Sequence, residues 1–254
     1  MYKLGALLLL LAGLAGLAMA NEATPQGRIL GGEEASATYA PYAVSLRIDN
    51  AHVCGASIVS ELHLLTAAHC LYRDGKLVAA SRLSGRVGST NQYAGGRIVT
   101  VAAVTPHPDY NQLSNNLAII TLASPLALTD RIQVIELVDM DEALPEDGAE
   151  VSVAGWGITV DGITSFKLRQ LDLQLASNAV CLDAYKGHDP TKSFCLAHGL
   201  REGTCNGDGG SAAVHNDRLI GVSNFVVGAC GSRYPDVFVR IAGYKDWLQE
   251  QLGN

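Results

Sequence analysis

The stretch Cys205-Asn206-Gly207-Asp208-Gly209-Gly210-Ser211-Ala212-Ala213-Val214 holds three glycines beside one aspartate and then runs into small apolar residues. Gly209, at its centre, has no side chain with which to attack a carbonyl group. Two shorter stretches carry side chains suited to chemistry: Thr66-Ala67-Ala68-His69-Cys70 and Asn115-Asn116-Leu117-Ala118-Ile119. A lone histidine is usually structural, so the meaning of His69 depends on the pattern around it.

These three stretches resemble the catalytic motifs of chymotrypsin-like serine proteases. The nucleophile loop of that family reads Cys-x-Gly-Asp-Ser-Gly-Gly-Pro, and Gly209 stands where its serine belongs. The resemblance places His69 at the position of the general base and Asn116 at the position of the triad aspartate. It also implies that the backbone N–H groups of Gly207 and Gly209 form an oxyanion hole.

Both replacements remove a side chain that the catalytic mechanism of the family needs. In studied serine proteases, loss of the serine costs about 10⁶ in turnover, and asparagine for the triad aspartate costs about 10⁴. We therefore expect a proteolytically inactive homologue that binds a protein partner, an uncut substrate or an inhibitor. The alternative is a weak or unorthodox serine endopeptidase that uses Ser211 as a displaced nucleophile. Asn224 stands where the family has a serine that supports the aspartate, which is consistent with an uncharged Asn116.

The amino-terminal region predicts secretion. Lys3 is followed by an apolar run, Leu4 to Leu17, and by Ala18-Met19-Ala20, a pattern typical of a signal peptide over residues 1–20. A membrane anchor is the alternative, but the run is shorter than the roughly 20 residues that span a bilayer. Residues 21–28 are then expected to form a propeptide, and residues 29–254 the protease-like domain.

The segment Arg28-Ile29-Leu30-Gly31-Gly32 resembles the activation junction of the family. The resemblance implies that an upstream trypsin-like protease cuts after Arg28. The freed α-amino group of Ile29 would then fold inward and pair with the Asp208 carboxylate.

Composition limits the partners and cofactors. The 254 residues carry a formal charge of −7, which argues against nucleic acid or an anionic membrane as a partner. Acidic residues between Asp139 and Glu150 are typical of a solvated loop. The loop Gly88–Gly96 has no carboxylate, so the calcium site of some relatives is not expected. We expect no cofactor and no metal.

The chain has six cysteines, which in a secreted protein predict three disulfides. The residues alone permit fifteen pairings, and no cysteine or histidine spacing favours zinc. The family resemblance implies one set: Cys54–Cys70, Cys181–Cys195 and Cys205–Cys230.

Short apolar or alternating runs separated by Gly, Asn, Asp and Pro predict an all-β domain. The runs are Ala43–Ile48, Val53–Val59, Ile98–Val104, Leu117–Leu122, Val151–Ala154, Leu171–Leu175, Leu219–Val222 and Val237–Ile241. A helix is expected only at the tail, where Ile241, Tyr244, Leu248 and Leu252 share one face. The resemblance implies two packed six-stranded antiparallel barrels with the site between them.

The primary specificity pocket departs from the trypsin pattern. Gly203 stands where trypsins have the aspartate that selects arginine and lysine. Val226 replaces a glycine at the pocket mouth and is expected to narrow it. Asp236 replaces a wall glycine and would offer a carboxylate from the opposite side. The alternative is a relic pocket filled by these side chains. The loop sequences resemble those of insect members of the family.

Overall fold

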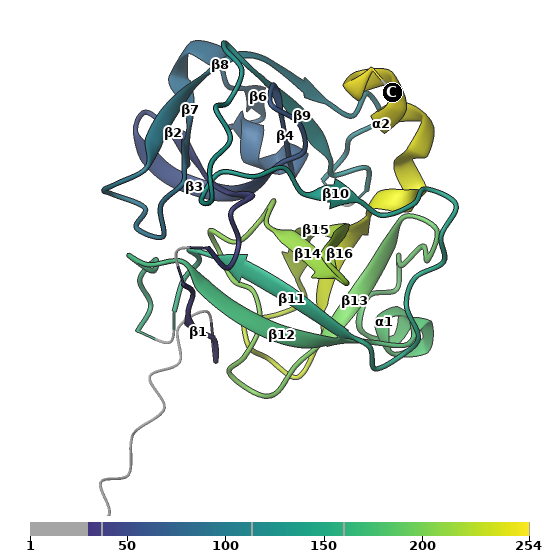
Figure 1. Ribbon diagram of the computed structural model, residues 1–254. Coiled ribbons are helices and arrows are strands. Elements are labelled where there is room, and N and C mark those ends of the chain that lie inside the picture. The colour runs from purple at the N-terminus through teal and green to yellow at the C-terminus, as the bar shows by residue number, and fades with distance from the viewer. Residues whose placement is uncertain (1–29, 37, 113, 160, 254) are drawn as a thin grey trace, which may run out of the picture.

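The computed structural model describes residues 30–253 except 37, 113 and 160. The predicted signal peptide, the predicted propeptide and the Arg28–Ile29 junction lie outside the described residues. The described chain forms two β-barrels packed against each other (Figure 1). This architecture confirms the predicted fold class.

The first barrel is closed by six strands in the order β2-β3-β4-β9-β8-β7, with antiparallel neighbours. Its strands are β2 (Ala43–Ile48), β3 (Ala51–Ile58), β4 (His63–Thr66), β7 (Leu83–Val87), β8 (Arg97–Pro106) and β9 (Ala118–Leu122). Leu46, Leu64 and Ile120 are fully buried in its interior. Most residues of β2, β4, β7 and β9 are buried, so these strands enclose an apolar core.

The second barrel has the order β12-β11-β14-β15-β16-β13 and closes through a β12–β13 pairing. Its strands are β11 (Glu150–Gly155), β12 (Arg169–Leu175), β13 (Ser193–Ala197), β14 (Ala212–His215), β15 (Arg218–Val226) and β16 (Asp236–Arg240). Short strands lie outside the two barrels: β1 (Glu33–Glu34) on β12, β10 (Glu136–Leu137) parallel to β15, and the hairpin β5 (Tyr72–Arg73) with β6 (Lys76–Leu77). Residues 205–211, which we call the nucleophile-like loop, lead directly into β14.

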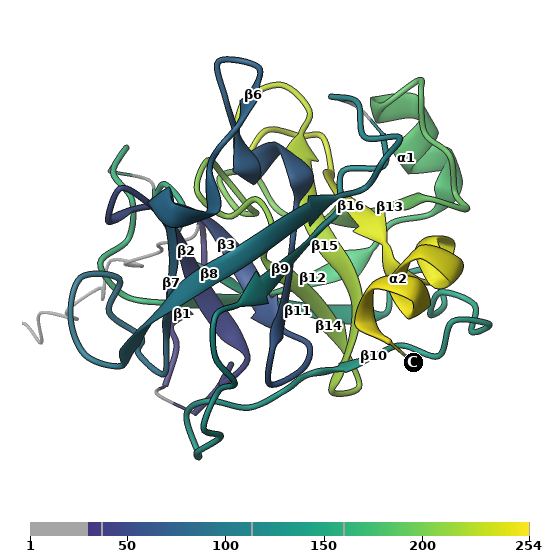
Figure 2. The same ribbon diagram turned by 90° about the horizontal axis from the view of Figure 1, so that it is seen from above.

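The predicted tail helix is present as a 3-10 turn, Ile241–Tyr244, followed by α2 (Lys245–Leu252). In the view from above, α2 lies at the right-hand side of the molecule (Figure 2). The ring of His107, just after β8 of the first barrel, packs 5.4 Å from Tyr244 and 5.1 Å from Trp247, measured between ring centroids. The carboxy-terminal tail, which follows the second barrel in sequence, thus packs against the first barrel. Within the described residues, no helix is both long and apolar enough to cross a membrane.

One helix was not expected from the sequence. α1 (Asn178–Ala184) begins after Ser177, whose hydroxyl accepts a hydrogen bond from the Val180 N–H. Cys181 is the one buried residue of this helix. No apolar stripe was therefore available to reveal it. The remaining 3-10 turns are Ala68–Leu71 and Ala80–Arg82.

The three disulfides join Cys54 to Cys70, Cys181 to Cys195 and Cys205 to Cys230. These are the pairs that the family resemblance implied.

Candidate active site

A cleft of about 540 Å³ lies at the junction of the two barrels. The first barrel supplies His69 and Asn116 to its wall, and the second supplies Gly209, Asn224 and Val226. The structure therefore brings the three triad-equivalent positions into one site, although they are far apart in sequence.

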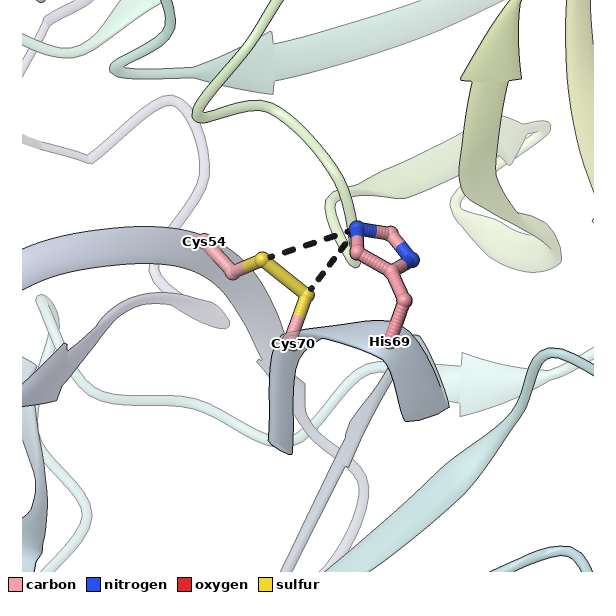
Figure 3. A group of neighbouring side chains, drawn as sticks. All are labelled: Cys54, His69 and Cys70. Atoms are coloured by element: carbon pink, nitrogen blue, oxygen red, sulfur yellow. Dashed lines mark hydrogen bonds between the residues drawn. A yellow bond between two sulfur atoms is a disulfide. The ribbon is translucent and has the colours of Figure 1, made fainter. Parts of the chain in front are cut away.

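His69 lies on the 3-10 turn after β4, which the Cys54–Cys70 disulfide fixes against β3. Its imidazole leans toward that disulfide, with Nε2 at 3.9 Å from the Cys54 sulfur and 3.6 Å from the Cys70 sulfur (Figure 3). A Cβ atom built on Gly209 would lie only 2.6 Å from Nε2. The histidine ring thus occupies the space of the missing side chain. Because the two sulfurs are bonded to each other, they offer no thiolate to a metal.

Asn116 sets the tautomer of His69. Its Oδ1 accepts a hydrogen bond from the His69 backbone N–H at 2.8 Å, which fixes the orientation of the amide. The opposite end, Nδ2, therefore faces His69 Nδ1 at 2.8 Å and donates to it. An acceptor Nδ1 leaves the proton of the neutral ring on Nε2. A general base needs the reverse arrangement, with Nε2 free to take a proton from the nucleophile.

Asn224 completes this arrangement from the second barrel. The register of β15 against β16 shifts between Ser223 and Phe225, so Asn224 lies at a β-bulge. A bulge re-aims a side chain, and here the Asn224 Oδ1 accepts from Asn116 Nδ2 at 2.6 Å. An oxygen acceptor at this place suits the NH₂ group of an asparagine.

The protonation state agrees with this geometry. Burial is the main reason why the pKa of His69 is lowered, and the nearby positive charge of Arg73 adds to the shift. The result is a pKa below the ordinary value of 6.5, so the ring is neutral near pH 7.

The loop around Gly209 is tightly held. Gly210 has φ of +83°, and a Cβ there would lie 2.2 Å from Thr66 Oγ1 and 2.3 Å from the Gly55 carbonyl, so no other residue fits. The Gly209 carbonyl accepts a hydrogen bond from the Gly55 N–H at 2.8 Å. Gly207 and Gly209 both line the cleft.

His52 is a site residue that the sequence did not reveal. Its Nε2 lies 3.1 Å from the Gly207 carbonyl, and its Nδ1 lies 2.8 Å from the Ser45 hydroxyl. Burial is the main reason why its pKa falls to about 4. A neutral ring therefore supports the backbone of the nucleophile-like loop. No short motif surrounds His52, so only its contacts identify it.

Ser211 does not lie beside the histidine. It is buried between the barrels, and a Cβ at Gly55 would lie 2.1 Å from its hydroxyl oxygen. The hydroxyl thus projects toward β3, and Ser211 is not among the residues that line the cleft.

Asp208 is completely buried. Its Oδ1 accepts from the Gly157 N–H at 2.7 Å and its Oδ2 from the Cys205 N–H at 3.0 Å. Burial raises the pKa of this carboxyl to about 7, against the opposing effect of the two hydrogen bonds. The expected partner, the α-amino group of Ile29, lies outside the described residues.

The pocket residues are only partly brought together. Val226 lines the cleft, as expected for a residue at the pocket mouth. Gly203 and Asp236 do not line it, and Asp236 is 1% exposed. Its carboxylate accepts a hydrogen bond from the Thr204 hydroxyl at 2.8 Å and faces His198. The structure thus corrects the expectation that Asp236 offers its carboxylate to the pocket.

The sequence matches a family model and several known proteins. The family model described as Trypsin matches residues 29–248. A vitellin-degrading protease of Bombyx mori is 32% identical over 247 residues, covering 94% of this chain and 92% of the relative. Trypsin alpha-4 of Lucilia cuprina is 33% identical, covering 92% and 91%. Trypsin epsilon of Drosophila erecta is 34% identical, covering 88% and 87%.

The match extends across both barrels and includes every residue of the cleft. With two barrels, three disulfides and a shared cleft at their junction, the chain belongs to the trypsin family of serine proteases.

Proposed function

We propose that this protein is a secreted trypsin-family homologue that does not hydrolyse peptide bonds and acts by binding a protein in its cleft. The observation that carries the proposal is the position of the His69 ring, 2.6 Å from where a Cβ of residue 209 would stand. A site poised for catalysis needs a nucleophile at that place, with the ring beside it.

The tautomer of His69 supports the proposal independently. A ring that accepts a hydrogen bond at Nδ1 carries its proton on Nε2 and has no basic lone pair to offer the cleft. Restoring a nucleophile alone would therefore leave it without a base. The cleft itself persists, and its volume of about 540 Å³ lies within the range of ordinary ligand sites.

The partner proposed for the cleft is a peptide segment of a protein inhibitor or of a substrate that stays uncut. Secretion is part of the proposal because three disulfides persist in an oxidising compartment. Amino-terminal sequencing of protein from the medium of expressing cells tests it. A start at Asn21 or at Ile29 is expected, and retention in the cells would contradict it.

The decisive test is labelling with a serine-reactive fluorophosphonate, together with hydrolysis of Arg, Phe, Ala and Val peptide esters. Both are measured after cleavage behind Arg28. We expect neither labelling nor turnover above a heat-denatured control. Labelling that disappears in Ser211→Ala would instead establish a weak protease with a displaced nucleophile.

A further inference from the structure

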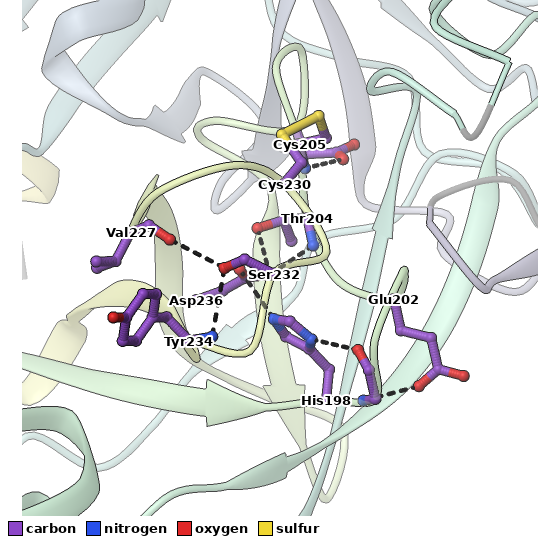
Figure 4. Close-up of polar contacts among 11 residues, drawn as sticks. His198, Glu202, Thr204, Cys205, Val227, Cys230, Ser232, Tyr234 and Asp236 are labelled. Carbon is purple, nitrogen blue, oxygen red and sulfur yellow. Dashed lines mark hydrogen bonds and ion pairs between the residues drawn. A yellow bond between two sulfur atoms is a disulfide. The ribbon is translucent and has the colours of Figure 1, made fainter. Parts of the chain in front are cut away.

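A polar cluster is centred on the carboxylate of Asp236 (Figure 4), and its member Thr204 also lines the cleft. Oδ2 accepts hydrogen bonds from both the backbone N–H and the hydroxyl of Thr204. Oδ1 lies 3.3 Å from Nε2 of His198, and the two side chains are only 2% and 1% exposed. Each carboxylate oxygen is thus occupied by a partner from the protein itself.

The hydrogen bonds of His198 define its charge. Nδ1 lies 2.8 Å from the carbonyl oxygen of Gly199, and Nε2 faces the Asp236 carboxylate. Both neighbours only accept hydrogen bonds, so both ring nitrogens must carry protons. The cluster therefore contains a buried imidazolium–carboxylate pair. Burial on its own lowers the pKa of His198, but the hydrogen bonds to Asp236 and Gly199 outweigh it and raise the pKa above 6.5.

The same pair fills the space that a side chain at position 203 would need. A Cβ on Gly203 would lie 2.6 Å from Asp236 Oδ2, 2.9 Å from His198 Cδ2 and 3.0 Å from His198 Nε2. Gly203 also has φ of +113°, which few other residues adopt. A carboxylate on residue 203 is therefore excluded while the pair is in place.

A ligand in the cleft meets neither member of the pair. The part of the cleft near the pocket is lined by Thr204, Cys205, Val226 and Gly228. These residues offer a hydroxyl and apolar surface, but no charge. Val226 adds a branched side chain that limits the size of an entering group.

We propose that His198 is the specificity-determining residue of this pocket: as an internal cation it neutralises Asp236 and keeps arginine and lysine side chains out, leaving room for small uncharged ones. This inference rests on the proposed function, because it names the kind of peptide side chain that the cleft accepts. It assigns His198 no part in catalysis.

The test compares a cation with its neutral isostere. Binding of benzamidine and of benzamide is measured by calorimetry on wild type, His198→Ala, His198→Gln, and each of these combined with Asp236→Asn. Wild type should bind both ligands weakly and about equally. Loss of the imidazolium should leave a free carboxylate and raise the benzamidine-to-benzamide affinity ratio at least about tenfold, as expected for a charge-assisted contact. Asp236→Asn should return the ratio to the wild-type value.

A purely structural role of His198 would change both affinities together and leave their ratio unaltered. His198→Gln keeps most of the side-chain volume and a hydrogen-bond donor. It replaces His198→Ala in the test where that variant does not fold. A wild-type ratio already as high as that of the variants, or an unchanged ratio in a folded variant, would overturn the proposal. Neither result depends on hydrolysis. The proposed absence of catalysis is tested separately, by the probe labelling and the ester assays.

Discussion

The positions of Gly209 and Asn116 both act on His69, so restoring either residue alone does not restore the site. A serine side chain at position 209 collides with the imidazole in its present position. Rotation of His69 about its side-chain bonds would relieve the contact, but Asn116 would still hold Nδ1 as an acceptor. We therefore expect Gly209→Ser alone to remain nearly inactive in ester hydrolysis.

Adding Asn116→Asp to Gly209→Ser should raise turnover by more than the product of the two single effects, because triad members act as a unit. The aspartate alone is worth about 10⁴-fold in trypsin. Asn224 can accept the change, because rotating its amide presents NH₂ instead of Oδ1 to the new carboxylate. Peptide-ester kinetics of the two single variants and the double variant measure this. Full activity of Gly209→Ser alone would refute the assigned role of Asn116.

The tautomer of His69 is directly measurable by nitrogen-15 NMR of the imidazole. We expect the proton on Nε2 in wild type and on Nδ1 in Asn116→Asp. Because the folded pKa lies below 6.5, the folded state binds fewer protons at this ring than the unfolded state does. The stability that the neutral ring contributes is full above pH 6.5 and is lost as pH falls toward the folded pKa. A wild-type ring protonated on Nδ1 at pH 7 would contradict this account.

Residues within contiguous motifs were predictable, and residues defined by long-range contacts were not. His69 and Asn116 lie inside recognisable short stretches. His52 acts on a carbonyl 155 positions away, and His198 on a carboxylate 38 positions away. Without its partner, Asp236 suggested a free carboxylate in the pocket. The neighbouring histidine reverses that interpretation, and only the fold brings the two together.

Strands were predictable where apolar residues form short runs between Gly, Asn, Asp and Pro. The eight predicted strands correspond to β2, β3, β8, β9, β11, β12, β15 and β16. α1 escaped prediction because it buries only Cys181 and exposes Val180 and Leu182. The disulfide from Cys181 to Cys195 of β13 ties the helix to the second barrel, and Cys181 is its one side chain in the buried cluster with Val237.

Removal of that bond should therefore unfold α1 selectively. The Cys181–Cys195 disulfide spans 14 positions, and a loop of about 15 residues is worth about 3 kcal/mol on a chain-entropy estimate. In Cys181→Ala/Cys195→Ala we expect amide exchange in residues 178–184 to become fast while β11 and β12 stay protected. Val180→Ala, at a residue 49% exposed, is the matched control and should change nothing. Retained protection of α1 in the double variant would show that packing holds the helix.

At the scale of the whole molecule, the start of the described chain runs beside the loop that carries Asp208. Leu30, the first described residue, pairs its backbone with Gly203, five positions before Asp208. The carboxyl is buried with its pKa raised to about 7, so its charge lacks full compensation among the described residues. Cleavage after Arg28 would supply the missing cation as the α-amino group of Ile29. Formation of this salt bridge does not need a catalytic nucleophile. Cleavage would therefore change the conformation of the binding face even in a protein without catalytic activity.

This idea predicts opposite pH profiles for the uncut and the cut protein. In uncut Arg28→Gln, Asp208 titrates near pH 7 when folded and near about 3.9 when unfolded. The folded state then binds more protons in this window, so stability should fall by up to about 4 kcal/mol as pH rises from 4 to 7. In cut protein the pair should depress the pKa of Asp208 and raise that of the amine above about 7.7–8.0. Its stability should hold through pH 7 and be lost as pH rises through the folded pKa of the amine.

Urea unfolding between pH 4 and 10 measures both profiles, with Asp208→Asn in each form as the control. The substitution should remove the pH 4–7 slope of the uncut protein and the alkaline loss of the cut protein. Hydrogen exchange of residues 203–207 and 226–230 reports the accompanying change of the pocket loops, which should be better protected after cleavage. Identical pH profiles and identical protection in the two forms would mean that Asp208 merely caps its loop, because an inserted amine cannot leave both quantities unchanged.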